Sequence, residues 1–474
     1  MLKNKRLAAF IRGLLVYAVF PNLAFAILSR FIFLSRPIVY LDYLAVGAVA
    51  VFFPRWVGGF LFALALSNDL LLNIGPIYHF RLLDFLRSTQ DVVYLNFRYI
   101  APILILLAAS VAVLSWASAV LAARASAGKE KIRLSASLLS VAAFIALLEI
   151  LNGTTVPFIH IAPANVAFSN VYLANSGLWR TYINLSDFQI HGDTIVKPIG
   201  TADSAMGVFL SSHGGRPAYP RVVLVVVESM GEFKDAAAES LMEGSLASPE
   251  ILRRYRLTRG TVPFWGGTIY GEFRELCQVR LVNLGLTIPA CLPKTLKRTE
   301  PGFESVGLHG FTNRFYRRYQ WYPQLGFDRI LMAEELYQAG ATKQCGAEFQ
   351  GICDTDVMKL IHQELLKGSR TKTKLVYWMT LNSHLPLDPA GGRESTLDCS
   401  QAPVTRTNPA ICLHTRMISV VLEGMKAIAE DPAIPSTAFI IVGDHAPPYM
   451  TLKERSLYRD DRVPYMILTP KGSR

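Results

Sequence analysis

Long apolar stretches dominate the first third of the chain, and a segment of that kind can only lie in a membrane or in a large buried core. Five stretches approach the roughly 20 residues that a helix needs to cross a bilayer: residues 8–34, 37–54, 56–76, 98–122 and 132–151. The first is too long for a cleavable signal peptide and continues into more apolar sequence. We therefore predict a bundle of about five transmembrane helices in residues 1–152, in which "FPRW" joins the second and third stretches as a hairpin or a re-entrant pair.

Basic residues predict the orientation of this bundle. They flank the first stretch and fill the connection between the fourth and fifth: Lys3, Lys5, Arg6, Arg12, Arg124, Lys129, Lys131 and Arg133. Cytoplasmic loops carry such an excess of Lys and Arg, so five crossings would place everything after residue 152 outside the cytoplasm. Membrane topology and anionic headgroups then account for the net charge of +12, and the sequence contains no nucleic-acid-binding module.

Two connecting segments have weaker patterns. Residues 80–99, "FRLLDFLRSTQDVVYLNFRY", have apolar residues at helical spacing. They predict an interfacial amphipathic helix on the outer surface or a solvated connecting helix. Residues 153–217 mix polar and aromatic residues without a period, and we interpret them as a juxtamembrane linker.

The cysteines are confined to the C-terminal half. They form three close pairs along the sequence, which favours local disulfides, although six cysteines allow fifteen pairings. Disulfides require an oxidising compartment, in agreement with the predicted orientation. No pair has CxxC spacing, so we expect no cysteine-ligated zinc. The six residues are Cys277, Cys291, Cys345, Cys353, Cys399 and Cys412.

From residue 218 the pattern becomes that of an α/β domain, which we place at residues 218–474. Short apolar runs, "RVVLVVVES", "KLVYWMTLNSH" and "TAFIIVGDH", alternate with helical stretches. Buried strands alternating with helices predict a mainly parallel sheet. In such sheets ligands bind beyond the carboxyl ends of the strands.

Polar residues that can bind metal follow these strands. Glu228, Asp444 and His445 end two of the runs, and two carboxylates with one imidazole suit a divalent cation with an open coordination position. Each residue alone would be an ordinary loop residue or helix cap. A fourth candidate is Thr268 in "TVPFWGGTIYGEF", where two glycines would let the backbone turn towards the ion. Metal coordination would make its hydroxyl an effective nucleophile.

Four motifs in order, "VVVES", "GGTIYGEF", "TLNSHLP" and "VGDH", resemble those of the alkaline phosphatase and sulfatase superfamily. Within it the chain looks most like the lipoteichoic acid synthase and phosphoglycerol transferase branch. That resemblance implies about five transmembrane helices followed by an extracytoplasmic sulfatase-like catalytic domain. It also implies that Glu228, Asp444 and His445 bind the metal together with Thr268, the nucleophile, and that His384 contacts the phosphoryl group.

Headgroup recognition is implied by a further pair of matches. The branch carries an aromatic residue and an arginine between an "HG" dipeptide and a "GF" or "GY". In "LHGFTNRFYRRYQWYPQLGF" these places fall on Tyr316 and Arg318, with tyrosine where the branch more typically has tryptophan. Glu272, in the pattern T-x-x-x-E-F that begins at Thr268, is expected at the same substrate site.

The resemblance predicts a membrane enzyme of the bacterial inner membrane with a periplasmic catalytic domain. It would move phosphoglycerol from a phospholipid, phosphatidylglycerol, through a phospho-threonine intermediate to a glycan hydroxyl, with one Mn²⁺ ion, or Zn²⁺ or Mg²⁺ instead. A phosphoethanolamine transferase acting on lipid A or a glycan is the first alternative. Those enzymes share the ligands and the threonine and are rich in disulfides, but they lack the T-x-x-x-E-F pattern.

Four other classes of protein can be compared with the sequence. A phosphodiesterase would pass the intermediate to water. A sulfatase would need a cysteine or serine in a C/S-x-P-x-R context, which the nucleophile segment lacks. A non-catalytic sensor would be expected to have lost the nucleophile or the ligands. A serine hydrolase using Ser229 is disfavoured because "VESMG" lacks the first glycine of G-x-S-x-G.

Overall fold

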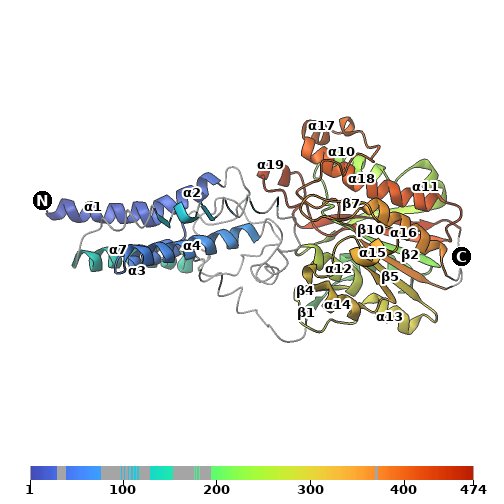
Figure 1. Ribbon diagram of the computed structural model, residues 1–474, viewed down its shortest axis with the longest axis horizontal. Coiled ribbons are helices and arrows are strands. Elements are labelled where there is room, and N and C mark those ends of the chain that lie inside the picture. The colour runs from blue at the N-terminus through green and yellow to red at the C-terminus, as the bar shows by residue number, and fades with distance from the viewer. Residues whose placement is uncertain are drawn as a thin grey trace. The chain divides into compact units, whose positions relative to one another are not determined.

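The computed structural model describes residues 2–28, 39–75, 129–152, 194–368 and 372–472, with some residues between 98 and 116 and between 176 and 181. The chain divides into two compact units, one made mainly of residues 1–188 and the other mainly of residues 189–474 (Figure 1). We describe each unit by itself.

Apolar helices make up the N-terminal unit. Two of them are long and apolar enough to cross a membrane, at Trp56–Asn73 and Lys131–Leu148, and two shorter apolar helices lie at Phe10–Leu23 and Leu41–Ala50. The prediction of five spans is therefore not confirmed, since the described part of the chain has two helices of sufficient length. Most of the predicted span 98–122 and of the amphipathic segment 80–99 lies outside the described residues. The helical elements are α1 (Leu2–Leu14), η1 (Leu15–Val19), α2 (Phe20–Leu28), α3 (Leu41–Ala50), α4 (Arg55–Ile74) and α7 (Lys129–Asn152).

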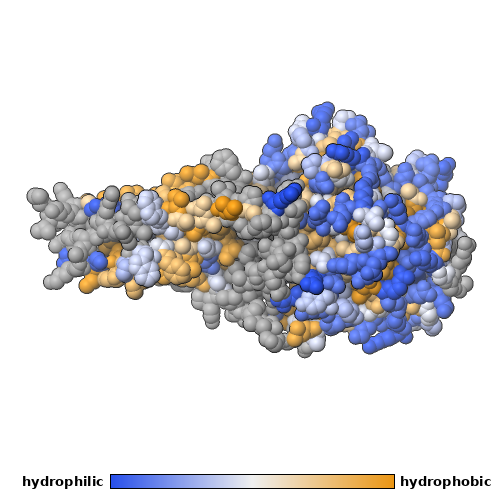
Figure 2. Space-filling model, viewed as in Figure 1, coloured by the Kyte–Doolittle hydropathy of each residue, from blue (hydrophilic) through white to orange (hydrophobic). Residues whose placement is uncertain are grey.

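The outer surface of these helices is apolar. Trp56 and Phe60 of α4 are 73% and 60% exposed, and Phe144 of α7 is 60% exposed. Figure 2 shows hydrophobic residues along this unit and mostly hydrophilic residues over the other. Large apolar side chains turned outward are costly in water and favourable in hydrocarbon, so this surface suits lipid contact.

A polar cluster lies inside the helical unit. Asp69 of α4 is buried and accepts hydrogen bonds of 2.6 Å from the Tyr43 hydroxyl and of 2.6 Å from the Asn73 amide. Buried polar groups need such partners because an unmet hydrogen bond costs free energy in an apolar setting. The cluster therefore links α3 to α4, whose connecting turn ends at Pro54.

A seven-stranded sheet forms the centre of the C-terminal unit, in the order β3-β11-β10-β2-β9-β5-β6. The five strands from β10 to β6 are parallel, while β11 pairs antiparallel with both β10 and β3. The mainly parallel sheet is thus confirmed. Strands β2, β9 and β10 are buried on both faces, which explains their unbroken apolar sequences. The bounds are β2 (Arg221–Val227), β3 (Tyr255–Pro263), β5 (Glu304–His309), β6 (Arg329–Leu331), β9 (Lys374–Met379), β10 (Thr437–Gly443) and β11 (Arg462–Pro470).

Helices cover both faces of the sheet (Figure 1). One layer contains α10 (Ala236–Gly244), α11 (Pro249–Arg254), α16 (Asp354–Leu366) and α18 (Pro409–Glu430), and the other α9 (Ala205–Ser211), α12 (Thr268–Cys277), α13 (Leu292–Thr299) and α14 (Arg318–Leu325). Shorter elements complete the unit: β1 (Ile195–Pro198), β4 (Val279–Asn283), β7 (Gln344–Cys345), β8 (Gly351–Ile352), η4 (Thr201–Asp203), η5 (Phe315–Arg317), η6 (Cys399–Gln401), α15 (Ala333–Gln338), α17 (Pro403–Thr407) and α19 (Leu452–Arg455).

Residues 194–217, the end of the predicted linker, form part of this unit. Strand β1 pairs antiparallel with β4, and α9 buries Ala205, Met206 and Phe209 in the core. Most of residues 153–193 lies outside the described residues.

The three local disulfides are confirmed. The bonded pairs are Cys277–Cys291, Cys345–Cys353 and Cys399–Cys412, so no cysteine of the chain is free.

Candidate active site

Two neighbouring strands bring the predicted metal ligands together. Val227 and Gly443 are paired at the ends of β2 and β10, so the next residues, Glu228 and Asp444, leave the sheet side by side. The His445 Nε2 atom lies 3.4 Å from Glu228 Oε1 and 3.3 Å from Asp444 Oδ2. All three side chains are buried, and they form a group that could hold a metal ion.

Thr268 reaches the same group from the start of α12. Its Oγ1 donates a hydrogen bond of 3.1 Å to Glu228 Oε2, and the side chain is buried. Gly267 precedes the helix in an extended conformation with a φ of −75°. One turn along, a Cβ atom on Gly271 would lie 2.9 Å from the Asp444 Cα, so this glycine allows α12 to approach the end of β10.

The donor set fits a divalent cation. Asp444 Oδ1 accepts hydrogen bonds from the backbone N–H groups of Ser229 and His445, whereas the buried Oδ2 has no hydrogen-bond partner among the described residues. The His445 Nδ1 atom lies 2.9 Å from the Ala446 carbonyl, which assigns the proton to Nδ1 and leaves Nε2 facing the carboxylates. These oxygen and nitrogen donors suit Mn²⁺, Mg²⁺ or Zn²⁺.

Electrostatics support the same conclusion. Burial and the nearby Asp444 raise the pKa of Glu228 well above its usual value, because two carboxylates in an apolar setting repel each other. A cation among these groups would reverse that effect by stabilising the ionised carboxylates.

Three hydroxyl residues support Glu228, and we had not predicted them as site residues. The Thr380 Oγ1 accepts a hydrogen bond of 2.9 Å from the Glu228 N–H, and the Ser383 Oγ donates one of 2.5 Å to the Glu228 carbonyl. Ser229 donates to the Glu228 carboxylate and has a left-handed backbone with a φ of 57°. Such a conformation is costly for a non-glycine residue and is often found at functional sites. All three residues lie inside the motifs "VVVES" and "TLNSHLP". Their position beside the predicted ligands could therefore have identified them as site residues.

His384 follows β9 and is partly exposed. Its Nδ1 atom lies 2.5 Å from the Leu385 carbonyl, so we place the proton on Nδ1 and leave Nε2 as a proton acceptor. Loss of hydration and the neighbouring His445 and His414 lower the pKa of His384 to about 3. His414 lies on α18, and the sequence did not identify it as a site residue because the periodic pattern of this helix is typical of an ordinary core helix. It is fully buried, and burial lowers its pKa to about 3.

Glu272 and Arg318 form a buried ion pair. The Arg318 Nη2 atom lies 2.9 Å from Glu272 Oε2, and both side chains are almost completely buried. Glu272 Oε1 accepts hydrogen bonds from the hydroxyls of Tyr322 and Tyr377. Glu272 therefore holds Arg318 in place, whereas the buried Arg318 Nε has no hydrogen-bond partner among the described residues.

Tyr316 lies next to this pair. The Arg318 guanidinium carbon is 5.3 Å from the centre of the Tyr316 ring. Tyr316 and Arg317 both have left-handed backbones, with φ values of 54° and 50°. Two such residues in succession form a tight turn, which presents Tyr316 just before Arg318 enters α14.

Arg274 holds helix α12, which begins at Thr268, and the sequence did not identify this residue as part of the site. Its guanidinium donates to the backbone carbonyls of Gly443 (2.5 Å) and Pro263 (3.1 Å) and to the Glu275 carboxylate (2.6 Å). Glu275 in turn accepts hydrogen bonds from Ser204 and Met206 at the start of α9. The pair therefore connects α12 to the strand end that carries Asp444.

The chain is similar to known proteins in its C-terminal part. The Sulfatase family model matches residues 278–474, which begin ten residues after Thr268. No curated protein sequence matches the chain. Solved structures with a similar fold include lipoteichoic acid synthase LtaP from Listeria monocytogenes (13% identity, TM-score 0.38, 54% of this chain and 66% of that one). The match thus spans less than two thirds of the LtaP chain.

Two further structures are similar to the same extent. One is the phosphoglycerol transferase GacH from Streptococcus pyogenes in complex with sn-glycerol-1-phosphate (14% identity, TM-score 0.34, 58% of this chain and 70% of that one). The other is the C-terminal periplasmic domain of EptC from Escherichia coli with Zn (13% identity, TM-score 0.35, 54% and 74%). Over residues 278–474, the part that the family model covers, the chain is thus similar to the Sulfatase family of the alkaline phosphatase and sulfatase superfamily.

Proposed function

We propose that the protein is a membrane-bound, metal-dependent transferase that moves a phosphoglycerol headgroup from a phospholipid to a glycan hydroxyl. The observation that carries this proposal is the buried hydroxyl of Thr268, 3.1 Å from a carboxylate of the Glu228, Asp444 and His445 group. The threonine and the three metal ligands that the superfamily resemblance implies therefore lie together at one edge of the sheet. Arg318 and Tyr316 are the proposed headgroup contacts.

In the first step Thr268 Oγ1 attacks the phosphorus of the lipid, phosphatidylglycerol in the leading case. An O–P bond to Thr268 forms, the P–O bond to diacylglycerol breaks, and the threonine proton passes to the departing alkoxide. In the second step a glycan hydroxyl attacks the phosphorus, gives up its proton and releases Thr268, which is protonated again. We assign the transfer of these protons to the neutral His384, whose Nε2 would be the acceptor.

The ion would be held by Glu228, Thr268, Asp444 and His445. When bound, a divalent cation supplies Lewis acidity, which lowers the pKa of the hydroxyl and stabilises charge on phosphoryl oxygens. We favour Mn²⁺, with Zn²⁺ and Mg²⁺ as alternatives. Arg318 adds a fixed positive charge, which Glu272 orients.

We place the catalytic unit on the outer side of the bacterial inner membrane. Two observations support this location: three disulfides, which need an oxidising compartment, and helices with outward apolar surfaces. The donor would then lie in the membrane, and the acceptor would be a periplasmic or surface glycan.

A phosphoethanolamine transferase is the second candidate function. The three disulfides favour it, because the resemblance associates that group with many disulfides. A phosphodiesterase would use the same first step and end with water.

The test uses the full chain in vesicles that contain headgroup-labelled phosphatidylglycerol or phosphatidylethanolamine, with and without a glycan acceptor. We expect diacylglycerol release and label on the glycan with phosphatidylglycerol, and neither with Thr268→Ala. Label on the glycan only from phosphatidylethanolamine would select the second candidate. Free glycerol phosphate formed equally without acceptor would select a phosphodiesterase.

A further inference from the structure

A short disulfide-closed loop reaches the candidate site from the side of β5. Residues 345–353 are closed by the Cys345–Cys353 bond, with β7 and β8 paired antiparallel at their base. At the tip, the ring centre of Phe349 lies 3.9 Å from that of His384. The same ring contacts Phe315 at 5.2 Å and Phe311 at 5.7 Å. Phe349 thus joins the histidine to an aromatic cluster whose next member is Tyr316, 4.5 Å from Phe315.

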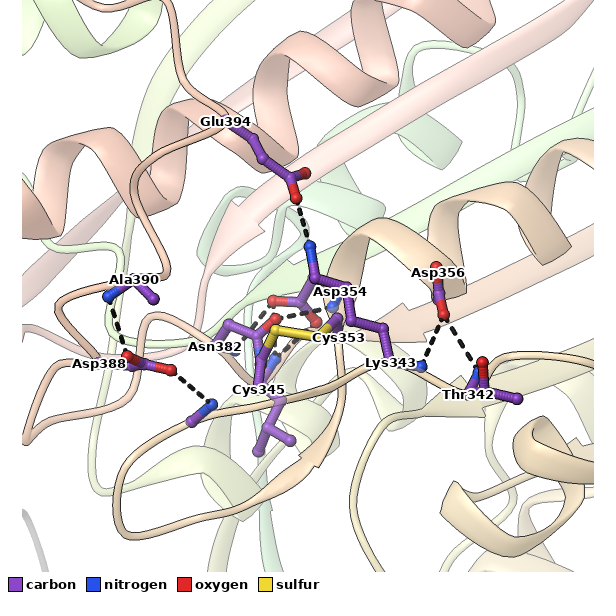
Figure 3. Close-up of a disulfide and its surroundings, with 12 residues drawn as sticks. Thr342, Lys343, Cys345, Cys353, Asp354, Asp356, Asn382, Asp388, Ala390 and Glu394 are labelled. Carbon is purple, nitrogen blue, oxygen red and sulfur yellow. Dashed lines mark hydrogen bonds and ion pairs between the residues drawn. A yellow bond between two sulfur atoms is a disulfide. The ribbon is translucent and has the colours of Figure 1, made fainter.

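The base of the loop is fastened to the chain that carries His384. Figure 3 shows Asp354, directly after Cys353, facing Asn382 beside the disulfide. The Asp354 carboxylate accepts hydrogen bonds from the N–H groups of Leu381 (3.1 Å) and Asn382 (2.9 Å), and the Asn382 side chain accepts one of 2.7 Å from the Asp354 N–H. This reciprocal pairing fixes the backbone two residues before His384.

Two further contacts join the loop region to the segment after His384. The Gly346 N–H donates to the Asp388 carboxylate at 3.4 Å, and Lys343 forms an ion pair with Glu394 (Figure 3). The loop is therefore tied to residues on both sides of the histidine.

A third anchor explains the glycine of the "HG" motif. The Ile352 N–H donates to the Gly310 carbonyl at 2.8 Å. A Cβ atom on Gly310 would lie 2.6 Å from the Ile352 carbonyl oxygen, so only glycine permits this approach. The loop base is thus held directly against the end of β5.

We propose that Phe349 is a positioning residue for His384, and that the Cys345–Cys353 disulfide keeps Phe349 in place. The ring packs against the imidazole, whose Nδ1 is already engaged by the Leu385 carbonyl, so the two contacts together restrict rotation of the histidine. The catalytic consequence rests on the proposed function, in which His384 Nε2 exchanges protons at the phosphoryl group. A misplacement of about 1 Å at such a group can cost about 100-fold in rate.

The first measurement does not depend on any substrate. Diethylpyrocarbonate modifies accessible neutral imidazoles, and tryptic peptide 375–393 contains His384 as its only histidine. We expect several-fold faster modification of His384 in Phe349→Ala and in the Cys345→Ser/Cys353→Ser double variant. Phe349→Tyr should stay near the wild-type rate. The control is Cys399→Ser/Cys412→Ser, which removes another local disulfide, at α17 and α18, and should change nothing at His384.

The second measurement is headgroup transfer. Phe349→Ala should lower kcat about 10- to 100-fold, Phe349→Tyr should recover most of the rate, and the content of bound metal should stay at the wild-type level. In the His384→Ala background, Phe349→Ala should add no further loss, because it acts through the histidine.

The outcomes are separable. Unchanged His384 modification in Phe349→Ala, or a full additional loss of rate in the His384→Ala background, would overturn the inference. Faster modification of His384 without headgroup transfer by any form of the protein would uphold the positioning contact and refute the proposed function. The single variant Phe349→Ala decides the question if the double cysteine variant does not fold.

Discussion

Glu228 is the residue at which most of the candidate site is connected. Its N–H, its carbonyl and both carboxylate oxygens are engaged by four hydroxyls, those of Thr380, Ser383, Ser229 and Thr268. The carboxylate is also within 3.4 Å of the His445 imidazole. A change of charge at this position without a change of shape therefore tests whether the group binds a cation.

Glu228→Gln should remove most of the bound metal and lower transfer at least 100-fold, because one of the ionised ligands is lost. The fold should survive, because the amide keeps a similar volume and removes a carboxylate that is costly to ionise when buried. Metal analysis of the purified variant and a transfer assay check this. Glu243→Gln, at the Arg259 ion pair outside the site, is the control and should keep its metal.

Glu364 offers a prediction about pH. Arg329, Lys374 and Lys367 surround its carboxylate at 2.8, 2.9 and 3.0 Å, and together they lower its pKa to about 2 against the opposing effect of burial. A depressed carboxyl pKa stabilises the fold above the pKa of the unfolded chain, near 4.3, and that contribution is lost as the pH falls towards 2.

Glu364→Gln should therefore lower the free energy of unfolding at pH 7 by about 2 kcal/mol, after allowance for solvent screening. The variant should also lose less stability than the wild type between pH 4.5 and 2. Denaturant unfolding of the full chain in detergent, followed across this pH range, measures both effects. Parallel pH curves for the two proteins would contradict the assignment.

At the scale of elements, helix α12 connects Thr268, the proposed nucleophile, to the rest of the candidate site. Thr268 is its first residue, and Glu272, one turn later, forms the ion pair with Arg318. Arg274 donates a hydrogen bond to the end of β10, and Cys277, the last residue of the helix, forms a disulfide. A small shift of α12 would therefore move the Thr268 hydroxyl, Arg318 and the strand end at Asp444 relative to one another.

Gly271→Ala is the sharpest test of this helix. The new Cβ would lie 2.9 Å from the Cα and Cβ of Asp444, so α12 must move away from β10. We expect the free energy of unfolding to fall by about 1–3 kcal/mol, as at other overpacked sites. Transfer activity should fall at least tenfold, and metal binding should be weaker.

Gly244→Ala in α10 is the matched control, since a Cβ there meets nothing within 4 Å. Alanine is the better helix former by about 1 kcal/mol, so this variant should be as stable as the wild type or more stable. Thermal unfolding and metal content measured on both variants compare the two sites. Equal stability and equal metal content in the two variants would show that the close contact between α12 and β10 does not matter for the site.

The sequence predicted those parts of the site that local pattern determines. Unbroken apolar runs indicated buried parallel strands. Because the ends of such strands lie at one edge of the sheet, Glu228 and Asp444 were expected to lie close together. The pairing of Glu272 with Arg318, 46 residues apart, and of Phe349 with His384 depends on loop conformations with no period. The left-handed turn at Tyr316 and Arg317 carries no glycine to signal it. Strand β1 is short and mostly exposed, so it lacked the alternation that marks a strand.

At the scale of the molecule, the chain combines an apolar helical unit with a unit that carries all six cysteines. Disulfides form in oxidising compartments, and basic residues flank the predicted cytoplasmic ends of the helices. These properties support the proposed topology, with the N-terminus in the cytoplasm and the C-terminal unit outside.

Protease added to spheroplasts should therefore digest an epitope tag placed after residue 474, whereas a tag before residue 1 should be protected until the membrane is broken. Peptide mapping without reductant should recover the three disulfides from the same cells. Protection of the C-terminal tag in intact spheroplasts would contradict the topology and, with it, an outer catalytic site.

The central claim is that Thr268 becomes covalently attached to the headgroup. Mass spectrometry of tryptic peptide 260–274, after incubation of the protein with phosphatidylglycerol vesicles and no acceptor, tests it most directly. We predict a glycerol phosphate adduct on Thr268 that needs a divalent cation, disappears when a glycan acceptor is added, and is absent from Thr268→Ala. Headgroup transfer that proceeds in Thr268→Ala, or an adduct found on another residue, would contradict the account.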